Sequence, residues 1–225
     1  MKIPEVGVWY YKLNSTDELK YSIRSAVNNL GLKKIILVGD KPKWFKETEN
    51  SIYVKSAPRR NPSYTLAYVP WQHMETFVNS GVYNGEFLLF NDDFYVLKPL
   101  KTWVDYYRDP LDYELKCGSR NRIYHRRELR ALQTLGKPLN SNHYNLHMPM
   151  RMNTEDLRKA VQFWNSSLNK DFEFRTTYGN MFPRPEEAHR DVKYDNDGTF
   201  LSGGDKLWYE DTVANLFPNK VFCEK

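Results

Sequence analysis

Two adjacent carboxylates at the end of an apolar run are the strongest chemical signal in this sequence. Residues 87–90 read Phe-Leu-Leu-Phe, and Asn91, Asp92 and Asp93 follow them directly. Ionised carboxylates beside a buried strand repel one another unless a cation or hydrogen-bond donors compensate them. A divalent ion such as Mg²⁺ or Mn²⁺ binds carboxylate oxygens together with ligand phosphates, and it stabilises the charge of a departing diphosphate. The alternative is an Asx turn that closes the strand, and spacing alone favours neither interpretation.

A second acidic pair, Glu210 and Asp211, follows a glycine turn and two aromatic residues near a predicted helix start. A carboxylate in such a place is a candidate general base, provided that it lies within hydrogen-bond reach of an acceptor hydroxyl. Acids in the first turn of a helix also favour the helix dipole without any chemistry. Both interpretations stay open.

Aromatic and basic residues offer surfaces for ligands. Tyr10 and Tyr11 end the first predicted strand, where a nucleotide base could stack, although core packing is an equal alternative. The basic stretch at residues 120–130 could bind acceptor phosphates, including a nucleic-acid backbone. A solvated helix face is the simpler explanation for that stretch.

The elements that must position these residues begin with a β-α-β unit. Residues 6–11 read as a strand, apolar residues recur at helical spacing over 19–30, and residues 35–38 read as a buried strand. Gly31 is the predicted C-cap of the helix. A right-handed crossover would make the two strands parallel and place the ligand crevice at their carboxyl ends. Asp40 would lie on that rim.

Later segments continue the alternation of helices and strands. Residues 52–54 predict a short strand within a loop-rich region. Asn153 or Thr154 is the predicted N-cap of one of the later helices. The predicted helices cover residues 71–80, 124–135, 154–168 and 210–217.

Length and composition narrow the class of protein. A chain of 225 residues with 40% hydrophobic composition can bury one core, so we expect a single domain. The net charge of +5 favours acidic partners such as phosphates, nucleotides, nucleic acid or anionic glycans. Apolar runs are too short for a membrane span and no signal-peptide pattern is evident, which makes cytoplasmic residence the default expectation. Cys117 and Cys223 are expected to be free thiols.

Several familiar motifs are absent from the sequence. It contains no Gly-x-Gly-x-x-Gly, P-loop or Gly-x-Ser-x-Gly pattern and no paired-cysteine motif. These absences argue against a dinucleotide-dependent oxidoreductase, an NTPase and a hydrolase with a nucleophile elbow.

Three blocks of the sequence resemble the second conserved region of the Stealth family, over roughly the first hundred residues. The blocks are residues 17–25, 34–44 and 87–94, in the family's order and approximate spacing. Residues 147–149, with the helix that follows Asn153, resemble the family's histidine-containing third region. The family contains sugar-phosphate transferases that build capsule polysaccharides, and it includes the lysosomal-enzyme N-acetylglucosamine phosphotransferase.

This resemblance implies a GT-A-like α/β fold, in which one domain has a mixed, mostly parallel sheet flanked by helices. Residues 1–115 would form the half that binds the nucleotide-sugar, and residues 116–225 the acceptor-side half. Asp92 and Asp93 would bind Mn²⁺ or Mg²⁺ and the diphosphate, with His147 as a metal ligand or proton-transfer group. The donor-binding set would be Tyr10, Tyr11, Arg24, Asp40, Asn91 and Asp92. Asp93 and either Glu210 or Asp211 would be catalytic.

The sequence departs from the family in one block. The family's first region has a strand ending in a Trp-Val-Asp-Gly-Ser-Asp-like sequence, whereas residues 8–14 contain no aspartate and no glycine. We therefore expect a metal-dependent glycosyltransferase that uses a nucleotide-sugar, with a UDP-sugar favoured, and a hydroxyl acceptor on a glycan or a DNA base. Sugar-phosphate transfer is the second hypothesis. A non-catalytic module that binds nucleic acid or glycan is the third.

Overall fold

A computed structural model describes residues 1–12, 17–56, 67–108, 122–192, 197–203 and 213–225, which form a single α/β domain. The helices are α1 (Glu18–Leu30), α2 (Tyr68–Ser80), α4 (Arg122–Thr134), α5 (Thr154–Ser166) and α6 (Phe174–Met181). The strands are β1 (Val6–Tyr11), β2 (Lys34–Gly39), β3 (Ser51–Lys55), β4 (Glu86–Phe90), β5 (Phe94–Val96), β6 (Asp105–Tyr107), β7 (Met150–Asn153), β8 (Glu186–Ala188) and β9 (Phe200–Ser202).

The main sheet has five strands in the order β3-β2-β1-β4-β7. The first four are parallel, and β7 pairs antiparallel with β4 at the edge. Strand β1 lies at the centre, where both of its faces are covered, which explains its almost continuous apolar sequence. This mixed, mostly parallel sheet flanked by helices confirms the predicted α/β class.

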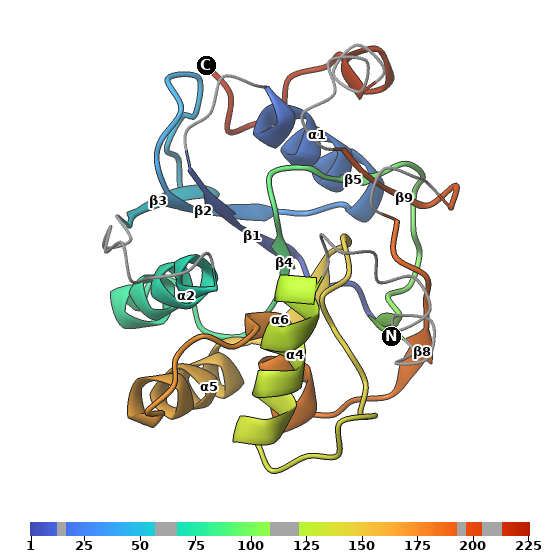
Figure 1. Ribbon diagram of the computed structural model, residues 1–225. Coiled ribbons are helices and arrows are strands. Elements are labelled where there is room, and N and C mark those ends of the chain that lie inside the picture. The colour runs from blue at the N-terminus through green and yellow to red at the C-terminus, as the bar shows by residue number, and fades with distance from the viewer. Residues whose placement is uncertain (13–16, 57–66, 109–121, 193–196, 204–212) are drawn as a thin grey trace.

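Helices cover both faces of the sheet, with α1 on one side and α2 and α5 on the other (Figure 1). Successive residues of β1 point to opposite faces. Val8 therefore packs in the cluster with α2 and α5, whereas Trp9 packs in the cluster with α1, and both are fully buried.

Trp9 and Ser22 connect the central strand to α1. The indole Nε1 of Trp9 donates to Ser22 Oγ at 2.9 Å, and that hydroxyl donates to the carbonyl oxygen of Phe94 at 2.6 Å. The Trp9 ring also stacks on Phe90 with centroids 4.3 Å apart. These contacts fix the place where β4 passes into β5, on either side of the Asp92-Asp93 turn.

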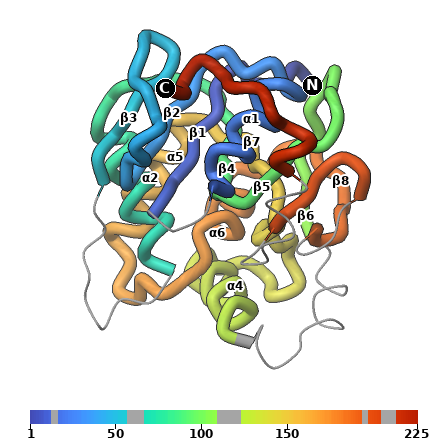
Figure 2. The backbone as a smooth tube through the Cα atoms, turned by 90° about the horizontal axis from the view of Figure 1, so that it is seen from above, coloured from blue at the N-terminus to red at the C-terminus, as the bar shows by residue number. Residues whose placement is uncertain are grey.

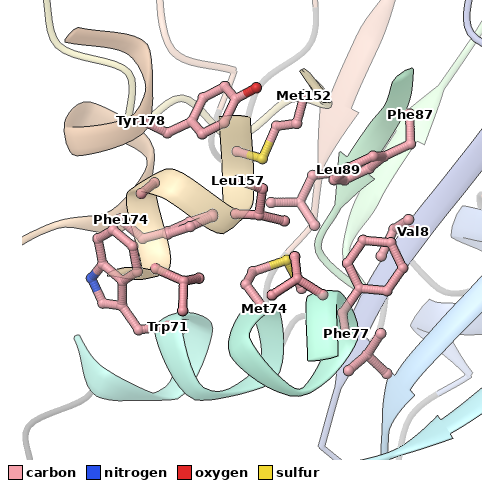
Figure 3. Packing of buried hydrophobic residues seen from close by; sticks show 14 of the residues in the cluster. Val8, Trp71, Met74, Phe77, Phe87, Leu89, Met152, Leu157, Phe174 and Tyr178 are labelled. Atoms are coloured by element: carbon pink, nitrogen blue, oxygen red, sulfur yellow. The ribbon is translucent and has the colours of Figure 1, made fainter. Parts of the chain in front are cut away.

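Aromatic packing fills the opposite layer. Figure 3 shows Trp71, Met74 and Phe77 of α2 pointing toward Leu157 of α5 and Leu89 of β4. Trp71 stacks on Trp164 at 5.6 Å and meets Phe174 edge-on at 4.7 Å. Such large buried rings dominate core energetics, and here they anchor the start of α6 to α2.

Most of the predicted elements are present. Gly31 ends α1 in the left-handed conformation with φ 66°, and the Asn153 side chain accepts from the Glu155 N–H at 2.9 Å as the N-cap of α5. Residues 213–216 are helical, while residues 210–212 lie outside the described part of the chain. Helix α6 and strands β5 to β9 were not predicted. In the described ranges, no helix is long and apolar enough to cross a membrane.

Helix α6 lies between the sheet and α4, which is at the edge of the molecule (Figure 2). Within α6, Gly179 allows the ring of Tyr144 to approach the helix backbone. A Cβ atom at position 179 would lie 2.6 Å from three atoms of that ring. Tyr144 is itself fixed, because its hydroxyl donates to Glu186 Oε1 at 2.8 Å.

We expect Gly179→Ala to lower the free energy of unfolding by about 1 to 3 kcal/mol, the usual cost of overpacking a core. The better helix propensity of alanine offsets less than about 1 kcal/mol of that loss. Urea unfolding measures the difference. In a Tyr144→Ala background the ring is gone, so the same substitution should be neutral or stabilising. Equal destabilisation in both backgrounds would show that the ring contact is not the cause.

Candidate active site

A cavity of about 350 Å³ opens at the carboxyl ends of β1 and β4. Tyr10 contributes from β1, and Asn91 and Asp93 contribute from the turn after β4. Further walls come from α4, the start of α6, the segment 145–147, and from Pro70 of α2, Phe94, Arg108 and Asp191. Ligand crevices of open α/β sheets occur at this end of the strands, so the position agrees with the sequence-based expectation.

Arg175 is a buried cation that lines the cavity. Its Nη1 donates to the carbonyl oxygens of Leu146 and Met148 at 3.0 and 2.7 Å, and its Nη2 donates to Asn91 Oδ1 at 3.2 Å. The guanidinium also lies 5.0 Å from the centroid of the Phe94 ring. Only 4% of the residue is exposed, so its charge is poorly screened by water and acts strongly on whatever occupies the cavity.

Glu173 begins α6 and also lines the cavity. Its Oε1 accepts from the Arg175 N–H at 3.0 Å, and its Oε2 accepts from the Thr176 N–H. Burial raises the pKa of Glu173, and the charge of Glu128 adds to that effect. This N-cap holds the first turn of α6, and with it Arg175, in position.

Asp93 is oriented by the strand that pairs with β5. Its Oδ2 accepts from Ser202 Oγ at 3.0 Å, and its carbonyl oxygen accepts from the Gly203 N–H at 3.2 Å. Asp92 is its half-buried neighbour in the same turn. Residues 92 and 93 form a turn after β4, and Asp93 in addition lines the cavity.

The three-residue metal site predicted from the sequence is not assembled by protein side chains alone. Over the described residues, no three His, Cys, Asp or Glu side chains gather in a way that could hold a metal ion. Asp93 lines the cavity, whereas its neighbour Asp92 does not. Their carboxylate oxygens are the kind of ligand that a Mg²⁺ or Mn²⁺ ion would take together with phosphates and water. His147 belongs to a different arrangement.

His147 forms a pair with Asp191 on the wall of the cavity. The imidazole Nδ1 lies 3.0 and 2.9 Å from the two carboxylate oxygens, and the His147 backbone N–H donates to Oδ1 at 2.9 Å. Arg108 approaches the same carboxylate at 3.8 Å. Burial acts to raise the pKa of Asp191, but the hydrogen bonds and charge of His147 and the charge of Arg108 outweigh it, so the pKa is lowered.

An ionised carboxylate can only accept hydrogen bonds, so whenever the imidazole of His147 has lost its charge, the remaining proton is on Nδ1. The lone pair is then on Nε2, the nitrogen that Asp191 does not engage. A histidine held in this way can accept a proton from a bound hydroxyl group.

Tyr10 and Tyr11 occupy opposite faces of the sheet because they are consecutive residues of one strand. Tyr10 lines the cavity, and burial raises its pKa to about 12. Tyr11 is 3% exposed and packs in the core beside α1, so the structure does not bring it to the cavity. Core packing, the alternative considered for both residues, describes Tyr11.

Arg24 and Asp40 also lie outside the cavity lining. The guanidinium of Arg24 is buried in an ion pair with Glu224 at 2.7 Å, and it donates to the carbonyl oxygens of Phe217 and Pro218. It joins α1 to the C-terminal segment, and the guanidinium groups that line the cavity are those of Arg108, Arg127 and Arg175. Asp40 is exposed at the end of β2, and its N–H donates to the Tyr11 carbonyl oxygen at 3.0 Å.

Glu210 and Asp211, the predicted candidates for the acceptor base, lie outside the described residues. The sequence offered no signal for Arg175 or Asp191 as site residues. Arg175 follows a cap in a helix of eight residues, which is too short to show helical periodicity. Asp191 meets His147 across 44 residues of chain, a pairing that local spacing cannot reveal.

His73 is a buried histidine behind Tyr10. Its ring stacks on that of Tyr10 at 6.0 Å, and only 2% of the residue is exposed. Burial lowers the pKa of His73 to about 4, and the charge of Asp40 opposes this shift only in part. The folded protein therefore holds His73 in its neutral form.

The low pKa of His73 predicts how stability depends on pH. The unfolded chain binds a proton on this residue as the pH falls below 6.5, whereas the folded chain does so only near 4. As the pH falls from 6.5 to about 4, the free energy of unfolding should therefore decrease in the wild type, and it should decrease less in His73→Gln. Urea unfolding at several pH values measures the two curves. Parallel curves across this window would contradict the assignment.

No protein-family model matches this chain, and no curated protein sequence matches it. Several solved structures resemble it at low identity. A glycosyltransferase involved in glycosylation of the major capsid of PBCV-1 has 12% identity and a TM-score of 0.47, over 94% of this chain and 97% of that one. The 4-diphosphocytidyl-2C-methyl-D-erythritol synthase of Anaerococcus prevotii has 9% identity and a TM-score of 0.45, over 93% and 97%. The glycosyltransferase GlyE of Streptococcus pneumoniae has 11% identity and a TM-score of 0.40, over 84% and 46%.

Proposed function

We propose that this protein transfers a sugar from a nucleotide diphosphate donor to a hydroxyl acceptor in the cavity at the ends of β1 and β4. The observation that supports this function is the meeting of three kinds of group on one cavity. These are the carboxylate of Asp93, the buried guanidinium of Arg175 and the His147-Asp191 pair. Together they match the needs of a reaction in which a diphosphate leaves while a hydroxyl group loses a proton.

The donor half of the reaction belongs to Asn91, Asp92, Asp93 and Arg175. A Mg²⁺ or Mn²⁺ ion bound by the two aspartates and the diphosphate would supply charge stabilisation to the leaving group. Arg175 adds fixed positive charge nearby, because its hydrogen bonds to Asn91 and to two carbonyl oxygens prevent it from turning away. The Tyr10 ring offers a face for the nucleotide, and a UDP-sugar is the favoured donor.

The acceptor half belongs to His147 and Asp191. Asp191 fixes the imidazole ring and its tautomer, so that Nε2 can take the proton of an acceptor hydroxyl as that oxygen attacks the sugar carbon. The acceptor oxygen forms the new glycosidic bond, the bond to the diphosphate breaks, and the proton remains on His147. This assignment gives the role of general base to His147, in place of the earlier candidates Glu210 and Asp211.

The donor assignment predicts a metal-dependent stabilisation by one nucleotide diphosphate. At a concentration about 100-fold above its Kd, the right nucleotide with Mn²⁺ should raise the melting temperature by roughly 5 °C or more. Asp93→Asn should abolish this shift, because the ion loses a charged ligand. Asp156→Asn on α5, outside the cavity lining, is the matched control and should respond as the wild type does. A full shift in Asp93→Asn would overturn the donor assignment.

The products distinguish sugar transfer from sugar-phosphate transfer. Transfer of the sugar alone releases a nucleoside diphosphate, whereas transfer of a sugar phosphate releases a nucleoside monophosphate. Chromatography of the nucleotide after incubation with donor and Mn²⁺ separates the two. We expect the diphosphate.

The acceptor assignment predicts a specific kinetic defect. His147→Gln should lower kcat by about 10² to 10⁴, the usual contribution of a general base. The melting shift with donor nucleotide and Mn²⁺ should remain, since the residue does not hold the donor. Asp191→Asn should give a smaller loss of kcat, because it misplaces the base without removing it. If His147→Gln instead lost the donor shift and kept kcat at saturating donor, His147 would be a donor or metal ligand.

A further inference from the structure

A second open cavity of about 380 Å³ is lined by residues between 107 and 186 and belongs to no part of the proposed reaction centre. Its walls include Tyr107 at the end of β6, Lys137, Ser141, Asn142 and Tyr144 after α4, Asn180 near the end of α6, and Arg184 and Glu186 at β8. We call this the outer cavity.

The outer cavity is separated from the candidate active site by a thin wall. Arg108 and His143 exchange two backbone hydrogen bonds, at 2.7 and 3.2 Å, so residues 107–108 and 142–145 run side by side. Neighbouring residues of extended backbone point to opposite sides. Accordingly, Tyr107 and Tyr144 line the outer cavity, while Arg108 and Asn145 line the candidate active site.

The wall of the outer cavity is rigid before any ligand arrives. The Tyr144 ring lies against Gly179, and its hydroxyl donates to Glu186 Oε1 at 2.8 Å. Asn180 Nδ2 donates to the carbonyl oxygens of Asn142 and Thr176, each at 2.9 Å. Side chains that are already ordered lose little entropy when they bind.

The side chains that hydrogen bonds fix in the walls of the outer cavity mainly offer hydrogen-bond acceptors to a ligand. Asn180 has committed its amide N–H groups to the protein, which leaves its side-chain oxygen as the atom that it can offer. Arg184 is shared between Glu86 and Asp156, at 3.5 and 3.6 Å, so its charge is already compensated. An anion would meet the exposed ammonium group of Lys137 and the hydroxyl group of Ser141 here, rather than a set of fixed donors.

Tyr107 adds an aromatic face to these acceptors. Its side chain is half-buried on the rim, so part of the ring is open to a ligand. A sugar has an apolar face of C–H groups, which packs against an aromatic ring, and hydroxyl groups at its edges, which donate to amide and carboxyl oxygens.

We propose that the outer cavity is a binding subsite for a neutral oligosaccharide. Glycan binding at this cavity is independent of the chemistry proposed above. The further step, that the bound glycan is part of the acceptor whose terminal hydroxyl reaches His147, rests on the proposed function.

The test is a glycan array probed with the full-length protein in the absence of nucleotide and metal. The wild type should retain a set of neutral oligosaccharides, and Tyr107→Ala should weaken their binding by about tenfold, because the stacking ring is lost. Tyr107→Phe keeps the ring and should bind the same glycans. Tyr83→Ala, which removes another half-buried tyrosine outside this cavity, should also bind as the wild type does. Urea unfolding confirms that each variant is folded.

Three results would overturn the proposal: no neutral glycan retained by the wild type, retention of anionic glycans only, or unchanged binding in folded Tyr107→Ala.

The Asp93→Asn variant separates this proposal from the proposed function. Glycan binding that survives in Asp93→Asn supports the outer cavity even if no donor nucleotide is found. Donor binding without glycan binding supports the reaction centre and rejects the outer cavity.

Discussion

The buried guanidinium of Arg175 is the interaction on which the rest of the site depends. A buried charge is tolerated only where hydrogen bonds replace the water that it has lost. Arg175 finds these partners in Leu146, Met148 and Asn91, on two separate segments of chain. The segment before β7, the start of α6 and the end of β4 are therefore held together by one side chain. Asn91 and His147 come to the same cavity as a result.

The elements that could be predicted are those whose signal is local. The β1-α1-β2 unit has clear periodicity and a glycine C-cap, and its parallel direction follows from the handedness of the crossover. Strands β5 and β9 have three residues each and are defined by a partner about a hundred residues away, as in the pairing of Val96 with Phe200. Strand β7 has four residues and follows Pro149. No local pattern marks such short strands.

The residues that line the cavity were predictable to the same extent. Tyr10, Asn91 and Asp93 could be expected there because they end strands of a parallel sheet, and the carboxyl ends of such strands share one edge. His147 came from the resemblance rather than from its spacing. Tyr11 and Arg24 lie elsewhere because strand alternation and the C-terminal segment decide which way they point, and the C-terminal contact spans 200 residues of chain. Asp191 could not be predicted from the local sequence, because its partner His147 is 44 residues away in the chain.

Two kinds of structure meet at this edge of the sheet. The proposed donor side is built on the ends of buried strands, whose positions are fixed by the core around Trp9 and Phe90. The proposed acceptor side is built on segments joined by the Arg108 and His143 backbone pair. One layer of backbone thus forms a wall of both cavities, and Arg108, which approaches Asp191 at 3.8 Å, belongs to it. A shift of the backbone in this layer would act on both cavities at once, whereas Asp93 lies on the proposed donor side alone.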